Sequence, residues 1–260
     1  MNEKEYRALV QVSQSECKSI LQESVRDWHY KKRNRKPATE AMIRGTICHK
    51  AIELGHKSVF ESEYAVDRWP SETGLKRSQK GYKEYKASLR ESGRPYIKEE
   101  DIEKIEGMLG SVERDFGMLC KGGNPEYAIT GVEMGGVTCK GLIDHLPPKD
   151  FIFDYKTTGM KLDDRQLYRF LHYDLWKVQA AFYHDLYKAK YGESRSFVFL
   201  IVVDYPPHNT RKMVVEPYSE AMESGRELYL EAIETYKKYN DCEFDDLPKQ
   251  KIYRASQEGR

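Results

Sequence analysis

The segment FIFDYKTTG, residues 151–159, places an aspartate and a lysine inside a stretch that otherwise has the composition of a buried strand. Because alternate side chains of a strand share a face, Asp154 and Lys156 lie on one face with Ile152, and the aromatic residues lie on the other. Burying either charge without a partner is costly. The pair therefore requires a mutual ion pair, a metal ion or an opening to solvent, and an edge-strand ion pair is the simplest structural interpretation.

The preceding sequence predicts that this strand is the third of a β-meander. Residues 127–134 (YAITGVEM), 136–146 (GVTCKGLIDHL) and 151–158 (FIFDYKTT) are short and rich in β-branched and aromatic residues. GG and PPKD separate them, as expected for hairpin turns. Three successive antiparallel strands follow from this pattern.

Apolar periodicity predicts the elements on either side of the meander. Helical spacing indicates helices over residues 13–30, 44–57, 98–120, 163–190 and 219–239. Ser13 and Glu16 form an S-x-x-E capping box at the start of the first. Two apolar runs, residues 196–207 and 212–218, have strand composition, and residues 67–98 suggest a loop followed by an exposed helix.

No linker divides the chain, so we expect one domain over residues 1–250. Its first part, residues 1–122, is predicted to be mainly helical, and residues 123–250 to form a core of sheet and helices. Residues 251–260 have the composition of a tail.

Composition excludes several classes of protein. The chain has 260 residues, 33% of them charged, yet 12% aromatic residues and regular apolar periods favour a folded protein. Its five scattered cysteines form no C-x-x-C pair, which argues against a disulfide framework and predicts a reducing cytoplasm. No run approaches the ~20 apolar residues of a membrane span, and the first ten residues lack a signal core. The net charge of +1 favours no partner by itself.

A second carboxylate points to metal chemistry. Asp144 ends the strand before FIFDYKTTG, and the short turn between the two strands would bring it close to Asp154. Two adjacent carboxylates raise the pKa of one of them unless a cation lies between, and Mg²⁺ or Mn²⁺ prefers oxygen ligands. Lys156 on the same face could orient a water or offset charge on a phosphate. This combination indicates phosphodiester hydrolysis.

These motifs resemble the PD-(D/E)XK nuclease superfamily in its RecB-like branch. The matching segments are GLID, then DYK with its aspartate ten residues after Asp144, then QAAFY on the following helix, and GTICH upstream, Gly45 to His49. The resemblance implies an α/β fold with a restriction-endonuclease-like core, in which helices flank a central mixed β-sheet and extra helices precede it.

The resemblance also implies roles for residues at the matching positions. His49, Asp144 and Asp154 would bind Mg²⁺, for which Mn²⁺ is expected to substitute. The backbone carbonyl of Tyr155 would add a ligand, and Lys156 would position the attacking water.

Three further side chains are candidates for the same site. Gln179 and Tyr183 match the Q-x-x-x-Y pattern of the branch, lie on one helical face, and would orient Lys156 or the substrate phosphate. Glu126 is a candidate for holding a metal-bound water or a second ion, although Glu133 is as plausible on spacing.

The order of the motifs is similar to that of the RecE family, the exonuclease VIII group of phages and prophages. This resemblance implies an ATP-independent 5′ to 3′ exonuclease that acts on linear double-stranded DNA and leaves 3′ single-stranded overhangs for recombination. It further implies a RecT-like single-strand annealing protein as partner and a homo-oligomeric ring, with a tetramer favoured. Leu142 departs from the basic residue expected there. Cys242 stands alone near the C-terminus, so no iron–sulfur cluster is predicted.

Other functions stay open at this stage. A RecB-like endonuclease or single-strand DNA nuclease of another pathway would carry the same motifs, and a non-catalytic DNA-binding protein could retain them. His49, Glu53 and His56 would lie on one helical face as a zinc constellation, although the pattern is not H-E-x-x-H.

Contacts with DNA are expected from local concentrations of positive charge, although such runs are also common on solvated surfaces. Trp28, Trp69 or the tyrosines are candidates for opening a terminal base pair. The basic candidates are Lys31, Lys32, Arg33, Arg44, Lys76, Arg77 and Lys80.

Overall fold

The computed structural model centres on a five-stranded mixed sheet in the order β3-β4-β5-β6-β7. The strands are β3 (Asn124–Met134), β4 (Val137–Leu146), β5 (Phe151–Thr158), β6 (Ser196–Val203) and β7 (Thr210–Val215). Strands β5 and β6 are parallel and the other pairs antiparallel. The predicted meander is confirmed. The edge-strand interpretation of the Asp154–Lys156 pair is wrong, because β5 is the central strand of the sheet.

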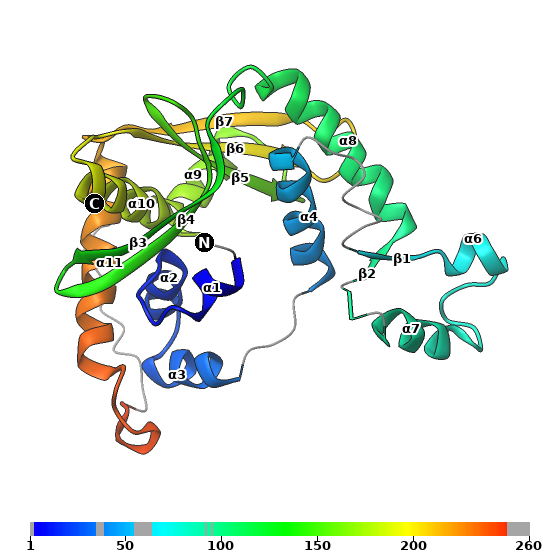
Figure 1. Cartoon of the computed structure of the whole chain (residues 1–260), viewed down its shortest axis with the longest axis horizontal. Helices are drawn as coiled ribbons and strands as arrows, with labels where there is room; N and C mark the ends of the chain where they lie inside the picture. The colour runs from blue at the N-terminus through cyan, green and yellow to red at the C-terminus, as the bar shows by residue number, and fades with distance from the viewer. Residues whose placement is uncertain (1–2, 35–38, 55–63, 92, 95, 249–260) are drawn as a thin grey trace.

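Helices cover both faces of the sheet, as expected for the α/β class. One apolar core joins the sheet to α2 (Gln14–Gln22), α10 (Trp176–Tyr191) and α11 (Glu220–Tyr239). A second core joins the opposite face to α4 (Glu40–Leu54) and α8 (Glu99–Phe116). Figure 1 shows α10 and α11 at one end of the molecule and α4 and α8 toward the other. The predicted restriction-endonuclease-like architecture is confirmed.

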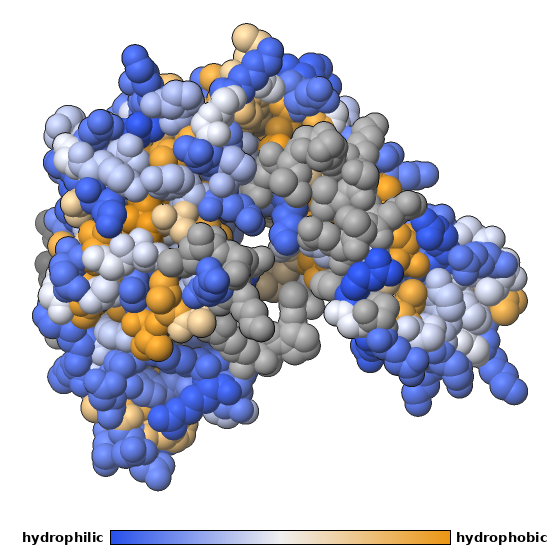
Figure 2. All heavy atoms as spheres, in the orientation of Figure 1, coloured by the Kyte–Doolittle hydropathy of each residue, from blue (hydrophilic) through white to orange (hydrophobic). Residues whose placement is uncertain are grey.

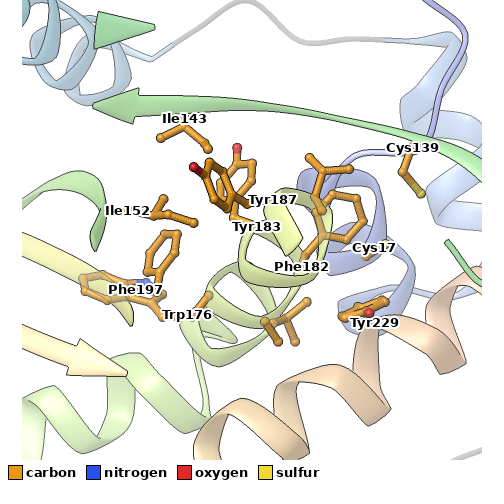
Figure 3. Packing of buried hydrophobic residues seen from close by; sticks show 14 of the residues in the cluster. Cys17, Cys139, Ile143, Ile152, Trp176, Phe182, Tyr183, Tyr187, Phe197 and Tyr229 are labelled. Atoms are coloured by element: carbon orange, nitrogen blue, oxygen red, sulfur yellow. The ribbon is translucent and has the colours of Figure 1, made fainter. Parts of the chain in front are cut away.

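The alternation predicted for β5 places its residues in different cores. Ile152 belongs to the core with α10, whereas Phe153 and Tyr155 belong to the core with α4 and α8. Figure 3 shows Trp176 and Tyr183 of α10 near Ile152 and Phe197, and Phe182 on the side of Cys17 and Tyr229. Strand β6 is buried along almost its whole length because both of its faces are covered, which explains its continuous apolar sequence.

Two segments predicted as single helices are each broken into two. Residues 13–30 contain α2 and the start of α3 (Val25–Arg33), with Ser13 and Ser24 as N-caps. The Ser24 hydroxyl accepts a hydrogen bond from the Asp27 backbone N–H at 3.1 Å, which begins the second helix. The later stretch divides into α9 (Asp164–His172) and α10, where Leu175 adopts a left-handed φ of 57°.

The sheet forks between β4 and β5. Their register pairs His145 with Phe153, whereas the beginning of β4 instead pairs with the chain near Val12. The Val12 N–H donates to the Thr138 carbonyl at 3.0 Å, and the Lys140 N–H donates to the Val12 carbonyl at 2.8 Å. The N-terminal segment therefore occupies the edge of β4 that β5 leaves, and the separation opens the sheet beside Asp144.

A smaller substructure, which we call the arm, comprises the described part of residues 64–98. It contains β1 (Ala65–Asp67) and β2 (Tyr96–Lys98), which pair in parallel, and α6 (Trp69–Thr73) and α7 (Tyr82–Glu91). Figure 1 shows the arm projecting beyond α4 and α8, away from α11. The exposed helix expected here is present as α7, but the two strands were not predicted.

The structure describes residues 3–34, 39–54, 64–91, 93–94 and 96–248. Its remaining elements are α1 (Glu3–Ala8) and a short 3-10 helix, η1 (Phe244–Asp246). No helix within these residues combines the length and apolar character required to cross a bilayer. The predicted tail, residues 251–260, lies outside the described part of the chain.

Candidate active site

Asp144 and Asp154 converge at the fork of the sheet. The Asp144 carboxylate accepts a hydrogen bond from the Tyr155 N–H, with 2.9 Å between Oδ2 and N. This side-chain acceptor satisfies a β5 backbone donor at the point where β4 diverges. Asp144 is thereby tied to the residue next to Asp154, which brings the two carboxylates into one site.

His49 reaches the site from α4. Its Nδ1 lies 3.6 Å from Asp144 Oδ2, and both side chains retain some exposure, 27% for His49 and 21% for Asp144. One turn earlier on the helix, a Cβ at Gly45 would lie 3.2 Å from the Thr157 hydroxyl, which is tighter than an ordinary contact. Gly45 therefore allows α4 to pack closely on the end of β5, which gives the G-x-x-x-H pattern a physical reason.

Lys156 and Gln179 both engage Asp154, which is 3% exposed. Lys156 Nζ lies 2.5 Å from Asp154 Oδ2, while the Gln179 amide donates a hydrogen bond to Oδ1. The Asp154 Oδ2 atom is buried and accepts no hydrogen bond of good geometry despite the nearby ammonium. The Trp176 and Phe199 rings, with centroids 5.7 and 5.8 Å from Lys156 Nζ, form an apolar wall beside the amine.

Tyr183 lies against the backbone of β4. Its hydroxyl donates a hydrogen bond to the Leu142 carbonyl at 2.9 Å, and its expected role toward Lys156 or the substrate phosphate stays a prediction. A Cβ at Gly141 would lie 2.5 Å from the Tyr183 ring, so the ring packs directly on the β4 backbone. The fork explains this arrangement, because β4 carbonyls that have lost their β5 partner need another donor. Tyr183 therefore stabilises the β4 backbone, and Gln179 fixes the Asp154 carboxylate by its hydrogen bond.

The electrostatics of the site reflect two acids that share a partly enclosed space. Burial raises the pKa of Asp144 to about 8, and the charge of Asp154 contributes in the same direction. Burial lowers the pKa of His49 to about 4, and the nearby Lys156 charge adds to that shift. The imidazole is therefore neutral near pH 7, the form in which histidine binds a metal.

The donor chemistry fits a hard divalent cation. Mg²⁺ binds through one or two carboxylates and completes its octahedron with waters and phosphate oxygens. A cation between the two acids would lower the raised pKa of Asp144 and would find a buried oxygen, Oδ2 of Asp154, that accepts no hydrogen bond of good geometry. Within the described residues, no three His, Cys, Asp or Glu side chains surround a common point closely enough to hold an ion by themselves. Water or substrate oxygens would have to supply several of the ligands.

The structure distinguishes Glu126 from Glu133. Glu126 lies between Pro125 and Tyr127, whose β4 partners flank Asp144, and its charge contributes to the raised pKa of Asp144. Glu133 instead pairs opposite Thr138 and accepts a hydrogen bond from the Thr138 hydroxyl at 2.5 Å. Of the two, Glu126 is the residue close to the site.

Four of the basic residues considered for DNA contact have acidic partners. Lys31 pairs with Glu23 at 2.6 Å and Lys32 lies 3.5 Å from Glu16. Arg44 and Arg77 each contact two carboxylates. The other three are exposed and have no ion pair among the described residues; they are Arg33, Lys76 and Lys80.

Four further candidate residues are either buried or outside the described part of the chain. Trp28 and Trp69 are 2% and 8% exposed, so neither indole is placed to wedge a base pair. His56 and the side chain of Glu53, which belong to the alternative zinc constellation, lie outside what the structure describes.

Sequence reasoning missed Lys18. This α2 residue is largely enclosed, and burial followed by the Lys156 charge lowers its pKa to about 8, while Asp154 opposes the shift. A second amine thus lies within electrostatic range of the Asp154–Lys156 pair. Lys18 lies within the helix predicted over residues 13–30, but nothing in the spacing of that segment indicated that its side chain faces the site.

Comparisons with known proteins place the chain in a family and match its fold. The family described as "PDDEXK-like domain of unknown function (DUF3799)" matches residues 12–247. No curated protein matches the sequence. A crystal structure from Eubacterium rectale, of a protein with the provisional name of exonuclease, superposes with a TM-score of 0.64 at 15% identity, covering 94% of this chain and 88% of that one. The structure of SSO0001 has a TM-score of 0.31 at 16% identity, covers 73% and 85% of the two chains, and carries no argument.

Proposed function

The chain belongs to the family of PDDEXK-like domains, and from that premise we propose that it is a metal-dependent nuclease that degrades linear double-stranded DNA. Family and fold together support a nuclease. The observation that carries the proposal is the convergence of Asp144, Asp154 and Lys156 at the fork of the sheet, with His49 supplied by α4.

Each side chain has a distinct role in the proposed reaction. Asp144, Asp154 and His49 would hold the ion, with the Tyr155 carbonyl as a further ligand. The bound ion would polarise the scissile phosphate and stabilise its developing charge. Lys156 would hold the attacking water through its amine and offset negative charge on the phosphate. Gln179 keeps the Asp154 carboxylate in place by its hydrogen bond, while Glu126 adds negative charge at the margin of the site.

We further propose that hydrolysis starts from DNA ends and proceeds 5′ to 3′ without ATP, leaving 3′ overhangs. The support is the resemblance to the RecE family and the provisional name of the E. rectale protein. By the same resemblance, we propose a role in recombination beside a RecT-like annealing protein and assembly into a ring. A ring around DNA would explain processivity without ATP, because a closed oligomer cannot leave its strand between cuts.

A Mg²⁺ titration on linear duplex, labelled at either the 5′ or the 3′ end, tests metal dependence and polarity together. We expect early release of the 5′ label as mononucleotide and slow release of the 3′ label, with Mn²⁺ able to replace Mg²⁺. The matched substrate is the same sequence as a covalently closed circle. Cleavage of the circle at a comparable rate would replace the exonuclease proposal with the endonuclease alternative.

A Lys156→Ala variant separates catalysis from binding. Retained DNA binding with lost cleavage supports the nuclease. A wild-type protein that binds DNA but cleaves neither duplex nor single strands with Mg²⁺ or Mn²⁺ would favour the non-catalytic DNA-binding alternative. Size-exclusion chromatography with light scattering would test the ring, for which we expect four times the 30.4 kDa chain mass.

A further inference from the structure

The arm concentrates positive charge in a nearly neutral chain. Residues 64–98 contain nine Lys and Arg residues against four Asp and Glu, a net charge of +5, although the whole protein carries only +1. Figure 2 shows mostly hydrophilic residues over this lobe, which lies apart from the main body. The rest of the chain is therefore net negative, and the arm is the part that a polyanion would approach.

Helix α7 separates its charges by face. One face of the helix carries Tyr82, Tyr85 and Leu89 at helical spacing, and these side chains are half-buried against the rest of the arm. Lys83, Lys86 and Arg90 occupy a neighbouring stripe, because positions three and seven residues apart lie on one side of a helix. The two glutamates of the helix lie away from this stripe, so it is uniformly basic.

Among the residues that the structure describes, the stripe has no acidic partner. Within the described residues, no carboxylate pairs with Lys83 or Arg90, and Lys86 lies over the Tyr96 ring, 5.3 Å from its centroid. Arg77 is the contrast, since its guanidinium contacts Asp67 at 2.7 Å and Glu100 at 2.6 Å. Arg68 likewise lies 3.5 Å from Glu99, so these two arginines hold the arm together and against α8, whereas the cations of α7 are left for an external anion.

The aromatic residues of the arm are turned inward. The Trp69 and Tyr85 rings lie 5.2 Å apart, and Tyr82 stacks on Tyr85 at 6.4 Å between centroids. The Tyr82 hydroxyl donates to the fully buried Asp67 at 2.8 Å, and the Tyr85 hydroxyl accepts from the Arg68 N–H at 3.0 Å. Single-strand binding relies on exposed rings that stack on bases. A surface with cations but without such rings fits the phosphate backbone of a duplex.

The arm is anchored to the helix that carries His49. Ile43 and Arg44 of α4 line a small cavity with Tyr96 and Ile97 of β2. His49 is six residues beyond Ile43 along α4, a rise of about 9 Å at 1.5 Å per residue. Arg44 also contacts Asp101 of α8 at 3.4 Å, which ties α4 to the helix that follows the arm. A duplex held by the arm would therefore be held at a set distance from the candidate active site.

We propose that the basic stripe of α7, formed by Lys83, Lys86 and Arg90, binds the phosphate backbone of duplex DNA beside the active site. Lys76 and Lys80, which precede the helix, extend the same surface. This inference rests on the proposed function and adds to it a surface that positions uncut duplex. Such contacts are independent of sequence and depend strongly on salt, because each neutralised phosphate releases counterions.

The test uses a triple variant, Lys83→Gln, Lys86→Gln and Arg90→Gln, and a fluorescein-labelled 30-base-pair duplex with EDTA present to prevent cleavage. Fluorescence anisotropy at several salt concentrations gives both affinity and salt dependence. We expect affinity at 100 mM salt to fall roughly tenfold or more, and the slope of log K against log salt to become shallower by about two to three. A Lys83→Arg, Lys86→Arg variant keeps the charges and should bind like wild type.

The matched control removes three exposed charges from the opposite end of the molecule, Lys188→Gln, Lys190→Gln and Lys238→Gln. A control as weak as the arm variant, or an arm variant that binds duplex normally, would overturn the proposal. Loss of binding to a 30-base single strand with duplex binding unchanged would also overturn it. Because these assays require no hydrolysis, a protein without nuclease activity would refute the proposed function and leave the arm measurement valid.

Discussion

Asp185 of α10 and Asp144 at the fork of the sheet are both enclosed carboxylates, but the groups around them differ. Asp185 of α10 accepts hydrogen bonds from Arg226 at 2.6 and 2.9 Å and from the Tyr229 hydroxyl at 2.7 Å, and His184 Nδ1 lies 2.8 Å away. Asp144 at the fork accepts one backbone hydrogen bond and faces a second acid, Asp154.

The pKa values follow these surroundings. Burial would raise the pKa of Asp185, but the hydrogen bonds from His184, Arg226 and Tyr229 outweigh it and hold the pKa well below its usual range. The pKa of Asp144 instead rises to about 8. The charge of Asp185 is compensated within the protein, whereas Asp144 at the fork keeps a raised pKa that a divalent cation between it and Asp154 would lower. This contrast separates the candidate active site from the surrounding structural ion pairs.

The largest expected effect is on activity at the fork. Lys156→Ala should lower the rate of DNA hydrolysis by about 10³-fold, because the only cation touching Asp154 among the described residues is removed. Initial rates under saturating Mg²⁺ would measure the loss. Lys188→Ala, at an exposed lysine near the end of α10, is the control and should retain wild-type activity. A Lys156→Ala rate within tenfold of wild type would contradict the assignment.

An asparagine substitution at Asp185 should lower stability more than one at Asp154, the second acid of the fork. Asp185→Asn should lower the free energy of unfolding by about 2–4 kcal/mol, because the partly buried Arg226 loses its anionic partner. Asp154→Asn should change it by about 1 kcal/mol or less, since it also removes repulsion with Asp144. Urea denaturation at pH 7 measures both. Equal losses in the two variants would show that the acids at the fork are as well compensated as Asp185.

The decrease in the free energy of unfolding at acid pH should also depend on Asp185. Its folded pKa is depressed below the unfolded value of about 3.9, so its contribution is fully present above that value and is lost as the pH falls toward the folded pKa. Wild type should therefore lose stability relative to Asp185→Asn as the pH drops from about 5 to 3. Denaturation at several pH values would measure the difference, and parallel curves would be inconsistent with the depressed pKa.

The smallest expected effect is that of Tyr183→Phe. Removing the hydroxyl leaves the Leu142 carbonyl without its donor and should lower the free energy of unfolding by about 1–2 kcal/mol. Activity per folded molecule should stay within about threefold of wild type, because the hydroxyl contacts β4 and not Lys156. Thermal denaturation and initial rates at 25 °C provide the two values. An activity loss comparable to that of Lys156→Ala would restore the originally expected role for Tyr183.

Local sequence determined much of this protein. The period-2 alternation of β5, the short turns of the meander and the helical period of α8 and α11 specify their elements, because side-chain direction depends on residues two to four positions away. The spacing between Asp144 and Asp154 was also informative, since a short hairpin necessarily brings the ends of its strands together.

Tertiary structure alone decided the rest. Three features depend on residues distant in sequence. They are the central place of β5 in the sheet, the pairing of the chain near Val12 with β4 in its stead, and the hydrogen bond from Tyr183 to a backbone carbonyl. The same is true of Lys18, whose direction is set by the packing of α2, and of Arg77, whose partners come from two other segments of the chain. Charge and period are local properties of a sequence, but whether a charge is satisfied depends on which distant group folding places against it.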